Sequence, residues 1–183
     1  MNRKEALELV KSEVSKKNLI KHMLATEIAM KFLAEELDGD PKKWGLAGLL
    51  HDLDYDKTCD DFENHGILSA KILSEYDIEQ EIINAIRSHP NHEAYPPETT
   101  MAKALYSVDS LTGLIVAAAL MHPDKKLKSL DSDFIMRRFG EKRFAAGANR
   151  EQIKDCEKLG IDLERFIDIT LKAMQSISDD LGL

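Results

Sequence analysis

Hydrophobic positions recur with the spacing of an α-helix along almost the whole chain, and no segment alternates in the manner of a β-strand. In residues 18–38, for example, the apolar side chains form one stripe, and Gly39 marks the end of the segment. We therefore expect an all-α fold. The predicted helices span residues 2–16, 18–38, 41–53, 63–75, 78–89, 99–121, 149–159 and 162–180.

Two local signals support these boundaries. Asp40 and Pro41 are suited to the cap and the first position of a helix. Asn149 with Gln152 resembles a capping box at the start of another. The acidic segment 54–61 and a proline-rich turn after residue 89 are expected to be loops. No internal repeat or low-complexity tract interrupts the chain of 183 residues, so we expect a single domain, residues 1–183.

The charge of the chain limits its partners. A formal net charge of -8 disfavours binding to a nucleic-acid polymer, because that binding depends on Lys and Arg neutralising phosphates. A small anionic substrate remains compatible with an acidic protein when bound cations reverse the local field. The exception to the acidity is residues 137–150, which contain five basic residues and one acidic residue.

Targeting signals and cysteine chemistry give no sign of an extracellular or membrane location. The N-terminal residues lack an apolar stretch of signal-peptide type, and the longest nearly apolar run, residues 111–121, is too short to cross a bilayer. We expect a cytoplasmic protein without a membrane partner. Cys59 and Cys156 are far apart in sequence and outside any CxxC arrangement, so we interpret them as free thiols.

Side chains that can bind metals fall on the apolar faces of successive predicted helices. His22 lies on the apolar stripe of residues 18–38, and His51 with Asp52 ends the most apolar helix of all. The same placement holds for His65, His89 and Asp109 on the next three helices. Five helical segments thus direct metal-capable groups towards one interior.

A divalent metal ion is the strongest explanation of this arrangement. A single histidine on an apolar face is more often a hydrogen-bonded core residue than a ligand, so the interpretation depends on the combined pattern. Asp52 and Asp109 would be buried carboxylates, which need a compensating charge. Imidazole and carboxylate ligands suit iron, manganese, zinc, cobalt or nickel, and no thiolate narrows the choice.

The order of these residues resembles the H…HD…D signature of the HD-domain superfamily of metal-dependent phosphohydrolases. The signature comprises His22, His51 and Asp52 after the segment AGLL, and Asp109 within YSVDSLTGLI. The resemblance implies an HD-domain helical bundle with a metal-binding core at about 18–122 and a C-terminal helical extension at about 123–183.

In that superfamily these four residues hold one metal, and the Asp of the HD pair can bridge to a second. His65 and His89 stand where members with two metals carry further histidines, so the resemblance implies two divalent transition-metal ions per chain. The chain departs from the subgroup that continues HD with Ile-Gly-Lys, because it has Leu53, Asp54 and Tyr55 there. A cyclic-dinucleotide phosphodiesterase is therefore not expected. The segments HDLDYDKT, DSLTGLIVAAAL and GANREQI resemble instead a group of small bacterial and archaeal HD proteins.

The implied activity is hydrolysis of a phosphomonoester or phosphodiester, with a small phosphorylated, nucleotide-like substrate. A metal-bound hydroxide would be the nucleophile. Asp52 and Asp54 are the predicted catalytic carboxylates. Candidate substrate contacts, each of which also fits an ordinary surface side chain, are His92, Lys57, Arg87 and Arg143.

Two other functions remain open at this stage. The ligand set also resembles HD-fold oxygenases that hold two irons of mixed valence, and metal content with oxygen uptake would separate the two enzyme classes. A non-catalytic nucleotide-binding regulatory module would be favoured by missing ligands, and none is missing. A homodimer is a further possibility. Its interface, or simply the core, could use Leu120, Met121, Phe134 and Phe139.

Overall fold

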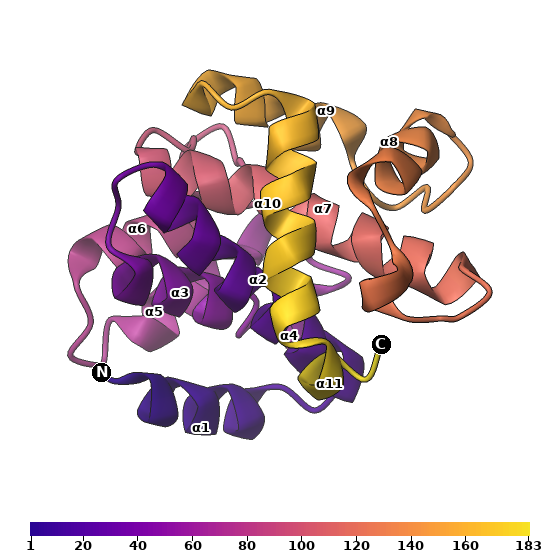
Figure 1. Ribbon diagram of the computed structural model, residues 1–183. Helices are drawn as coiled ribbons and strands as arrows, with labels where there is room; N and C mark the ends of the chain where they lie inside the picture. The colour runs from indigo at the N-terminus through magenta and orange to yellow at the C-terminus, as the bar shows by residue number, and fades with distance from the viewer.

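The computed structural model describes residues 1–183 and consists of helices joined by turns (Figure 1). Helix α2 (Lys17–Glu36) packs against α3 (Pro41–Leu50), α7 (Thr100–Met121) and α10 (Leu163–Ser176). The predicted all-α fold is confirmed. The remaining helices are α1 (Arg3–Glu13), α4 (Tyr55–Thr58), α5 (Ile67–Leu73), α6 (Gln80–Ser88), α8 (Ser132–Gly140), α9 (Arg150–Lys154) and α11 (Ser178–Leu181), with 3-10 turns η1 (Phe62–Asn64), η2 (Leu127–Ser129) and η3 (Asp155–Leu159).

Helix α7 lies at the centre of the bundle. It contacts α2, α6, α9 and α10, and most of its buried residues are apolar. By length and composition α7 could cross a membrane, but 56% of its most apolar window is buried inside the fold. Its hydrophobic character is therefore accounted for by its place in the core.

The C-terminal segment packs onto the same core as the rest of the chain. Helix α10 lies across α2 and α7, as Figure 1 shows, and its buried side chains join one continuous apolar cluster with theirs. Of the residues considered for a dimer interface, Phe139 is buried in this cluster and Phe134 is half-buried against it, whereas Leu120 and Met121 are exposed.

Several helix boundaries differ from the prediction. The helix expected over residues 63–75 begins only at Ile67, because Gly66 adopts a positive φ of 75° and breaks the chain direction after η1. The predicted helix 41–53 ends at Leu50, and the expected loop 54–61 contains α4. Helix α8 (Ser132–Gly140) was not among the predicted helices, and it contains only the first four residues of the basic segment 137–150.

The caps are partly as expected. The carboxylate of Asp40 accepts the backbone N–H groups of Lys42 and Lys43, and Pro41 is the first helical residue. The Asn149 side chain caps α9, but the predicted capping box is half formed. Gln152 does not return to the cap, since its side-chain amide bonds to α7 instead.

Candidate metal centre

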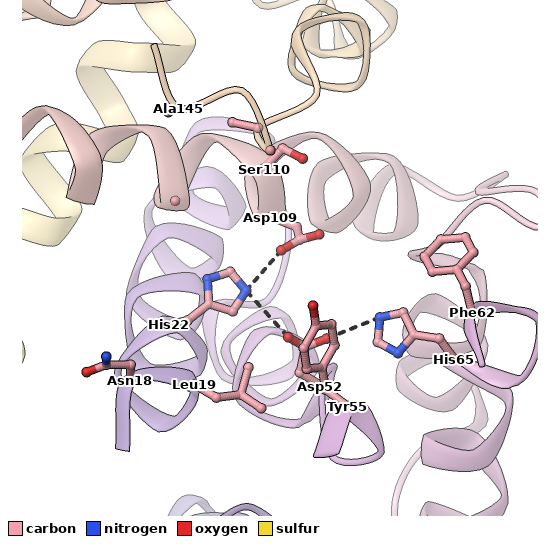
Figure 2. Close-up of a pocket in the computed structure, with 13 residues that line it drawn as sticks. Asn18, Leu19, His22, Asp52, Tyr55, Phe62, His65, Asp109, Ser110 and Ala145 are labelled. Atoms are coloured by element: carbon pink, nitrogen blue, oxygen red, sulfur yellow. Dashed lines mark ion pairs between the residues drawn. The ribbon is translucent and has the colours of Figure 1, made fainter. Parts of the chain in front are cut away.

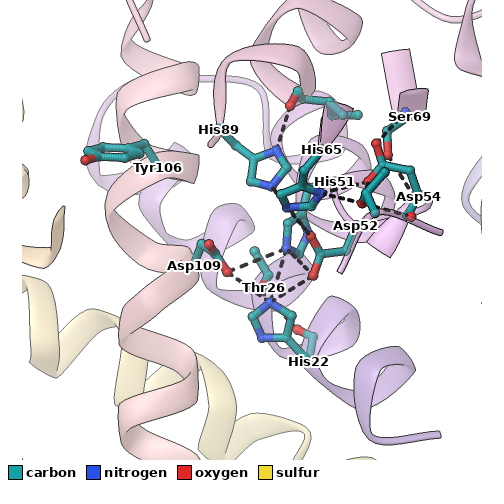
Figure 3. Close-up of polar contacts among 12 residues, drawn as sticks. His22, Thr26, His51, Asp52, Asp54, His65, Ser69, His89, Tyr106 and Asp109 are labelled. Carbon is teal, nitrogen blue, oxygen red and sulfur yellow. Dashed lines mark hydrogen bonds and ion pairs between the residues drawn. The ribbon is translucent and has the colours of Figure 1, made fainter. Parts of the chain in front are cut away.

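The predicted metal ligands converge on one point from five elements (Figure 3). His22 lies in the second turn of α2, and Asp109 is in the middle of α7. The other four lie where a helix or turn ends: His51 and Asp52 follow α3, His65 follows η1, and His89 follows α6. His51, Asp52, His65 and His89 are buried, while His22 and Asp109 are half-buried and border a cavity.

Helix α3 can bring His51 into this centre because Gly48 allows close packing on α2. A Cβ atom at Gly48 would lie 2.7 Å from the backbone oxygen of Thr26 on α2. The absence of a side chain thus permits the two backbones to approach, three residues before His51.

One group of ligands surrounds the Nε2 atoms of His22 and His51. These two nitrogens are 3.1 Å apart, and Asp109 Oδ1 lies 3.0 Å from the Nε2 of His22 and 3.6 Å from that of His51. Asp52 Oδ2 completes the group at 3.6 Å from His22 and 3.4 Å from His51.

A second group surrounds the Nε2 atoms of His65 and His89, which are also 3.1 Å apart. Asp52 Oδ1 lies 3.4 Å from His65 and 3.5 Å from His89. The two oxygens of the Asp52 carboxylate are therefore divided, one in each group. All the donor atoms within each set of three, His22–His51–Asp52 and Asp52–His65–His89, lie within 4.8 Å of one another.

Hydrogen bonds at Nδ1 set the orientation of every histidine in the centre. The Nδ1 atoms of His51 and His89 lie 2.8 and 2.6 Å from the backbone oxygens of Gly48 and Ile86, to which they donate. The Nδ1 of His65 lies 2.8 Å from Asp54 Oδ1.

The fourth histidine follows the same rule through a hydroxyl group. Thr112 donates its hydroxyl proton to the backbone oxygen of Asp109 at 2.8 Å, so its oxygen accepts from the Nδ1 of His22 at 3.1 Å. All four rings consequently direct Nε2 at the centre, the tautomer in which that nitrogen has a free lone pair.

This donor set fits divalent metal ions. Four imidazole nitrogens and two carboxylates are typical ligands of iron, manganese, zinc, cobalt or nickel, and histidine ligands commonly donate their other ring N–H to a carboxylate or backbone oxygen. Facing lone pairs 3.1 Å apart repel unless a proton or a cation lies between them. Neither cysteine belongs to the centre: Cys59 is exposed, and Cys156 is buried within η3.

The electrostatics of the metal-free chain agree with a cation-binding centre. Burial alone would lower the pKa of His51, but Asp52 and Asp109 outweigh it and hold that pKa well above its ordinary value. Burial would raise the pKa of Asp52 and of Asp109, but the adjacent histidines hold both pKa values well below the usual range. The two carboxylates are therefore held in the charged form, which is the form that binds a cation.

Asp54, predicted to be catalytic, lies behind the centre. It is fully buried, and it does not line the cavity. One of its oxygens accepts from His65 Nδ1 and the other from the backbone N–H of Ser69 at 2.8 Å. Burial would raise the pKa of Asp54, but the hydrogen bond and charge of His65, together with the Ser69 N–H and the charge of His89, lower that pKa. Asp54 does not reach the cavity and so cannot contact a substrate there. Its hydrogen bond from His65 Nδ1 instead fixes the orientation of that ring.

The predicted substrate contacts are not brought together at the cavity. Lys57 is exposed and pairs with Glu13, and Arg143 is exposed on the turn after α8. Arg87 stacks on the ring of Tyr95 at 4.4 Å, beside a separate hollow. His92 lies nearer, with its Nε2 at 2.9 Å from the backbone oxygen of His65, but it does not line the cavity.

The cavity in front of the metal centre has a volume of about 630 Å³ (Figure 2). Most of its lining was not predicted, because these residues are small, polar or aromatic and carry no recognisable motif. Ser110, next to Asp109, was the one residue that proximity in sequence could have indicated. The lining residues are Asn18, Leu19, His22, Asp52, Tyr55, Phe62, His65, Asp109, Ser110, Gly113, Ala145, Gly147 and Ala148.

An all-helical bundle with this convergence of His, His-Asp and Asp defines the class of metal-binding HD domains. Residues 19–119 match the model of the family described as HD domain, and the chain belongs to that family. The resemblance drawn from the sequence is thereby confirmed. Membership implies the metal-dependent phosphohydrolase superfamily, and the His/Asp cluster fits a metal site.

Curated relatives with this similarity are ribonucleases. Ribonuclease Y of Nitratidesulfovibrio vulgaris is 34% identical over 96 residues, which are 52% of this chain and 18% of that protein. Ribonuclease Y of Lawsonia intracellularis is 30% identical over 114 residues, 62% of this chain and 22% of the relative. That of Sulfurovum sp. is 28% identical over 137 residues, 73% and 26% respectively. The chain thus spans only a minor part of the length of these relatives.

Proposed function

We propose that this protein is a metal-dependent phosphohydrolase that holds two divalent ions and acts on a small phosphorylated substrate. The observation that supports it most strongly is the division of the Asp52 carboxylate between two groups of histidine Nε2 atoms. A carboxylate shared in this way is the expected bridge of a two-metal site.

The residues of the centre have separable roles in this proposal. His22, His51 and Asp109 would hold one ion, His65 and His89 would hold the other, and Asp52 would contribute one oxygen to each group. When bound, such ions lower the pKa of a coordinated water and neutralise phosphate oxygens. The second oxygen of Asp109 makes no ion pair with a histidine and is available to accept a hydrogen bond from water in the cavity.

The cavity favours a small substrate over a polymer. Its lining contains no lysine or arginine, and the predicted contact Lys57 is paired with Glu13. A nucleic-acid strand would need several such groups along its backbone. The net charge of -8 acts in the same direction, so the metal centre itself would be the anion-binding element.

Metal analysis combined with activity assays tests the proposal. Protein purified without added metal is compared by plasma mass spectrometry with the double variant His51→Ala, Asp52→Ala, and both are assayed against nucleoside monophosphates and phosphodiesters. We expect about two transition-metal ions per chain, a loss of metal in the variant, and phosphoester hydrolysis that follows the metal content. The absence of metal from the wild-type chain after reconstitution would contradict the proposal, and two irons with oxygen uptake would replace it with an oxygenase.

A second candidate is cleavage of RNA, which the name of the ribonuclease Y relatives favours. It predicts that a short single-stranded oligoribonucleotide is cut, with an activity that falls steeply as salt rises. The same preparation should then act poorly on mononucleotides. Hydrolysis of mononucleotides without cleavage of the oligonucleotide would exclude this candidate. A cytoplasmic location and a homodimer remain predictions beside either function.

A further inference from the structure

The turn between α8 and α9, residues 141–149, forms one wall of the cavity in front of the metal centre. Ala145, Gly147 and Ala148 line the cavity from this turn. Figure 2 shows Ala145 on one side of the view and Phe62 on the other, with Asp109 and Asp52 between them. The C-terminal segment therefore supplies part of the site, although it lies outside the residues that match the HD-domain family.

The wall is held by a single guanidinium group. Arg150, the first residue of α9, donates to backbone oxygens at both ends and in the middle of the turn. Its Nη1 atom lies 2.6 Å from the backbone oxygen of Ala145 and 2.7 Å from the backbone oxygen of Ala148. Its other donors reach the backbone oxygens of Phe139, Glu141 and Phe144.

No carboxylate competes for this guanidinium. Arg150 takes part in no ion pair, whereas the neighbouring Arg138 pairs with Glu141 on the surface. A planar group with five fixed donors can satisfy several carbonyl oxygens at once, which a lysine cannot do. Arg150 is therefore built into the backbone of the turn.

The conformation of the turn requires such support. Ala145 has a φ of 43°, in the left-handed region that a residue with a Cβ rarely adopts. Conformations of this kind persist where the surroundings determine them, and they are common where binding sites are shaped. The bond from Arg150 to the oxygen of this same residue is one such restraint.

The turn is also fixed relative to the metal ligands. The side-chain amide of Gln152, two residues after Arg150, donates to the backbone oxygen of Tyr106 at 2.6 Å and accepts from the Ser110 hydroxyl at 2.9 Å. Tyr106 and Ser110 lie on α7 on either side of Asp109 in sequence. The wall and the metal centre are thereby attached to the same stretch of helix.

We propose that Arg150 is a positioning residue that fixes residues 144–148 as a recognition wall for the organic group of the substrate, opposite the rings of Tyr55 and Phe62. This inference rests on the proposed phosphohydrolase function. The wall offers methyl groups and backbone, and the opposite side offers aromatic rings. The group recognised is accordingly flat and uncharged, such as a phenyl ring or a nucleobase, and it is attached to a phosphoryl group at the metals.

Two phosphonates, which contain no ester bond to hydrolyse, test whether the metal centre binds the phosphoryl group and the wall binds the organic group. Calorimetric titration of the metal-loaded protein compares methylphosphonate, which reaches only the metal centre, with phenylphosphonate, which also reaches the wall. Burial of the ring should make phenylphosphonate bind about tenfold more tightly to the wild-type chain. Arg150→Ala and Arg150→Lys should remove most of this preference while the affinity for methylphosphonate and the metal content stay as in the wild type. Added guanidinium should restore the preference in Arg150→Ala.

Controls separate positioning from general destabilisation. Arg165→Ala removes an exposed arginine of α10 that pairs with Glu36 and Asp168 and does not contact the turn, so it should leave both affinities unchanged. Gly147→Leu keeps Arg150 and its hydrogen bonds to the turn. A Cβ at Gly147 has nothing within 4 Å, so the chain should fold while the larger side chain fills the cavity. This variant should lose phenylphosphonate binding selectively, and it gives a test even where Arg150→Ala does not fold.

The outcomes distinguish the inference from the proposed function. Unchanged preference for phenylphosphonate in a folded Arg150→Ala would overturn the positioning role of Arg150, and unchanged preference in Gly147→Leu would overturn the wall as a recognition surface. An equal loss of both phosphonates in either variant would overturn the inference as well. If the metal-loaded wild-type chain binds neither phosphonate, the proposed function fails first and the inference fails with it.

Discussion

The substitution Asp54→Asn should weaken the binding of one metal ion without touching any metal ligand. Asp54 accepts hydrogen bonds on both oxygens, from His65 Nδ1 on one side and from the Ser69 backbone N–H on the other. Asparagine has the same shape but replaces one acceptor by a donor. Because the site is fully buried, water cannot correct the mismatch.

Each orientation of the asparagine has a cost. If its oxygen faces His65, its NH2 group faces the N–H of Ser69, and a buried pair of unsatisfied donors costs about 1–3 kcal/mol of stability. If its NH2 group faces His65, Nδ1 must become the acceptor, and the proton moves to Nε2. That tautomer has no lone pair for a metal. Loss of such a supporting hydrogen bond typically lowers metal affinity by about 10- to 100-fold.

Competition titration with a chelator, followed by plasma mass spectrometry, measures this effect. We expect one ion per chain to remain at wild-type affinity, held by the group around His22 and His51, and the second to be weakened by about 10- to 100-fold. Asp60→Asn, on an exposed residue of the same loop, is the matched control. Two ions bound by Asp54→Asn with wild-type affinity would refute the assignment of Asp54 as the residue that orients His65.

Three further predictions follow from other parts of the structure. Asp52 and Asp109 raise the pKa of His51 in the folded chain, so the protonated imidazole adds to the free energy of unfolding. This contribution is fully present below the unfolded pKa of about 6.5 and is lost as pH rises through the higher folded pKa. Metal binding should therefore release a proton, and the metal affinity should increase as pH rises. Calorimetry in buffers of different ionisation enthalpy measures the number of protons released, and a value of zero would contradict this prediction. Burial raises the pKa of the Cys156 thiol to about 12, so iodoacetamide should modify only Cys59 in the folded protein, and peptide mass spectrometry checks which thiol reacts. Gly48→Ala should lower the free energy of unfolding by about 1–3 kcal/mol, since its Cβ would lie 2.7 Å from the backbone of α2. Gly113→Ala, where the added Cβ meets no atom within 4 Å, should raise the free energy of unfolding by up to about 1 kcal/mol. Urea titration measures both variants, and changes in the free energy of unfolding of the same sign would refute the packing argument.

The predicted direction of a side chain agrees with the structure where helix periodicity alone decides it. His22 and Asp109 lie within regular helices, so their spacing from apolar neighbours already placed them on the buried face. His65 was assigned to an apolar stripe of a helix that does not include it, because the positive φ of Gly66 delays the start of α5. Its burial results from the turn, so the same conclusion was reached for a different reason.

The lysine and arginines predicted to contact substrate do not line the cavity. The positions of charged residues along a sequence do not indicate which residues they pair with in the folded chain. Lys57 pairs with Glu13, forty-four positions away in sequence, and nothing in either local segment indicates this contact. Arg150 was noted only as part of a basic segment, yet its donors are directed to the backbone of the turn before it. Contacts of this kind depend on a backbone path that no periodicity describes.

The sequence by itself determined the all-helical class, the family and the set of six metal-capable residues, because these follow from residue type, from helical periodicity and from the order of the motif residues along the chain. Only the tertiary structure decided which histidines share which oxygen of Asp52, that Asp54 supports His65 behind the centre, and that the C-terminal turn closes the cavity. The physical reason is that spacing fixes the direction of a side chain about its own helix axis, whereas distances between helices and the hydrogen-bond partners at their ends are set by packing of the whole core.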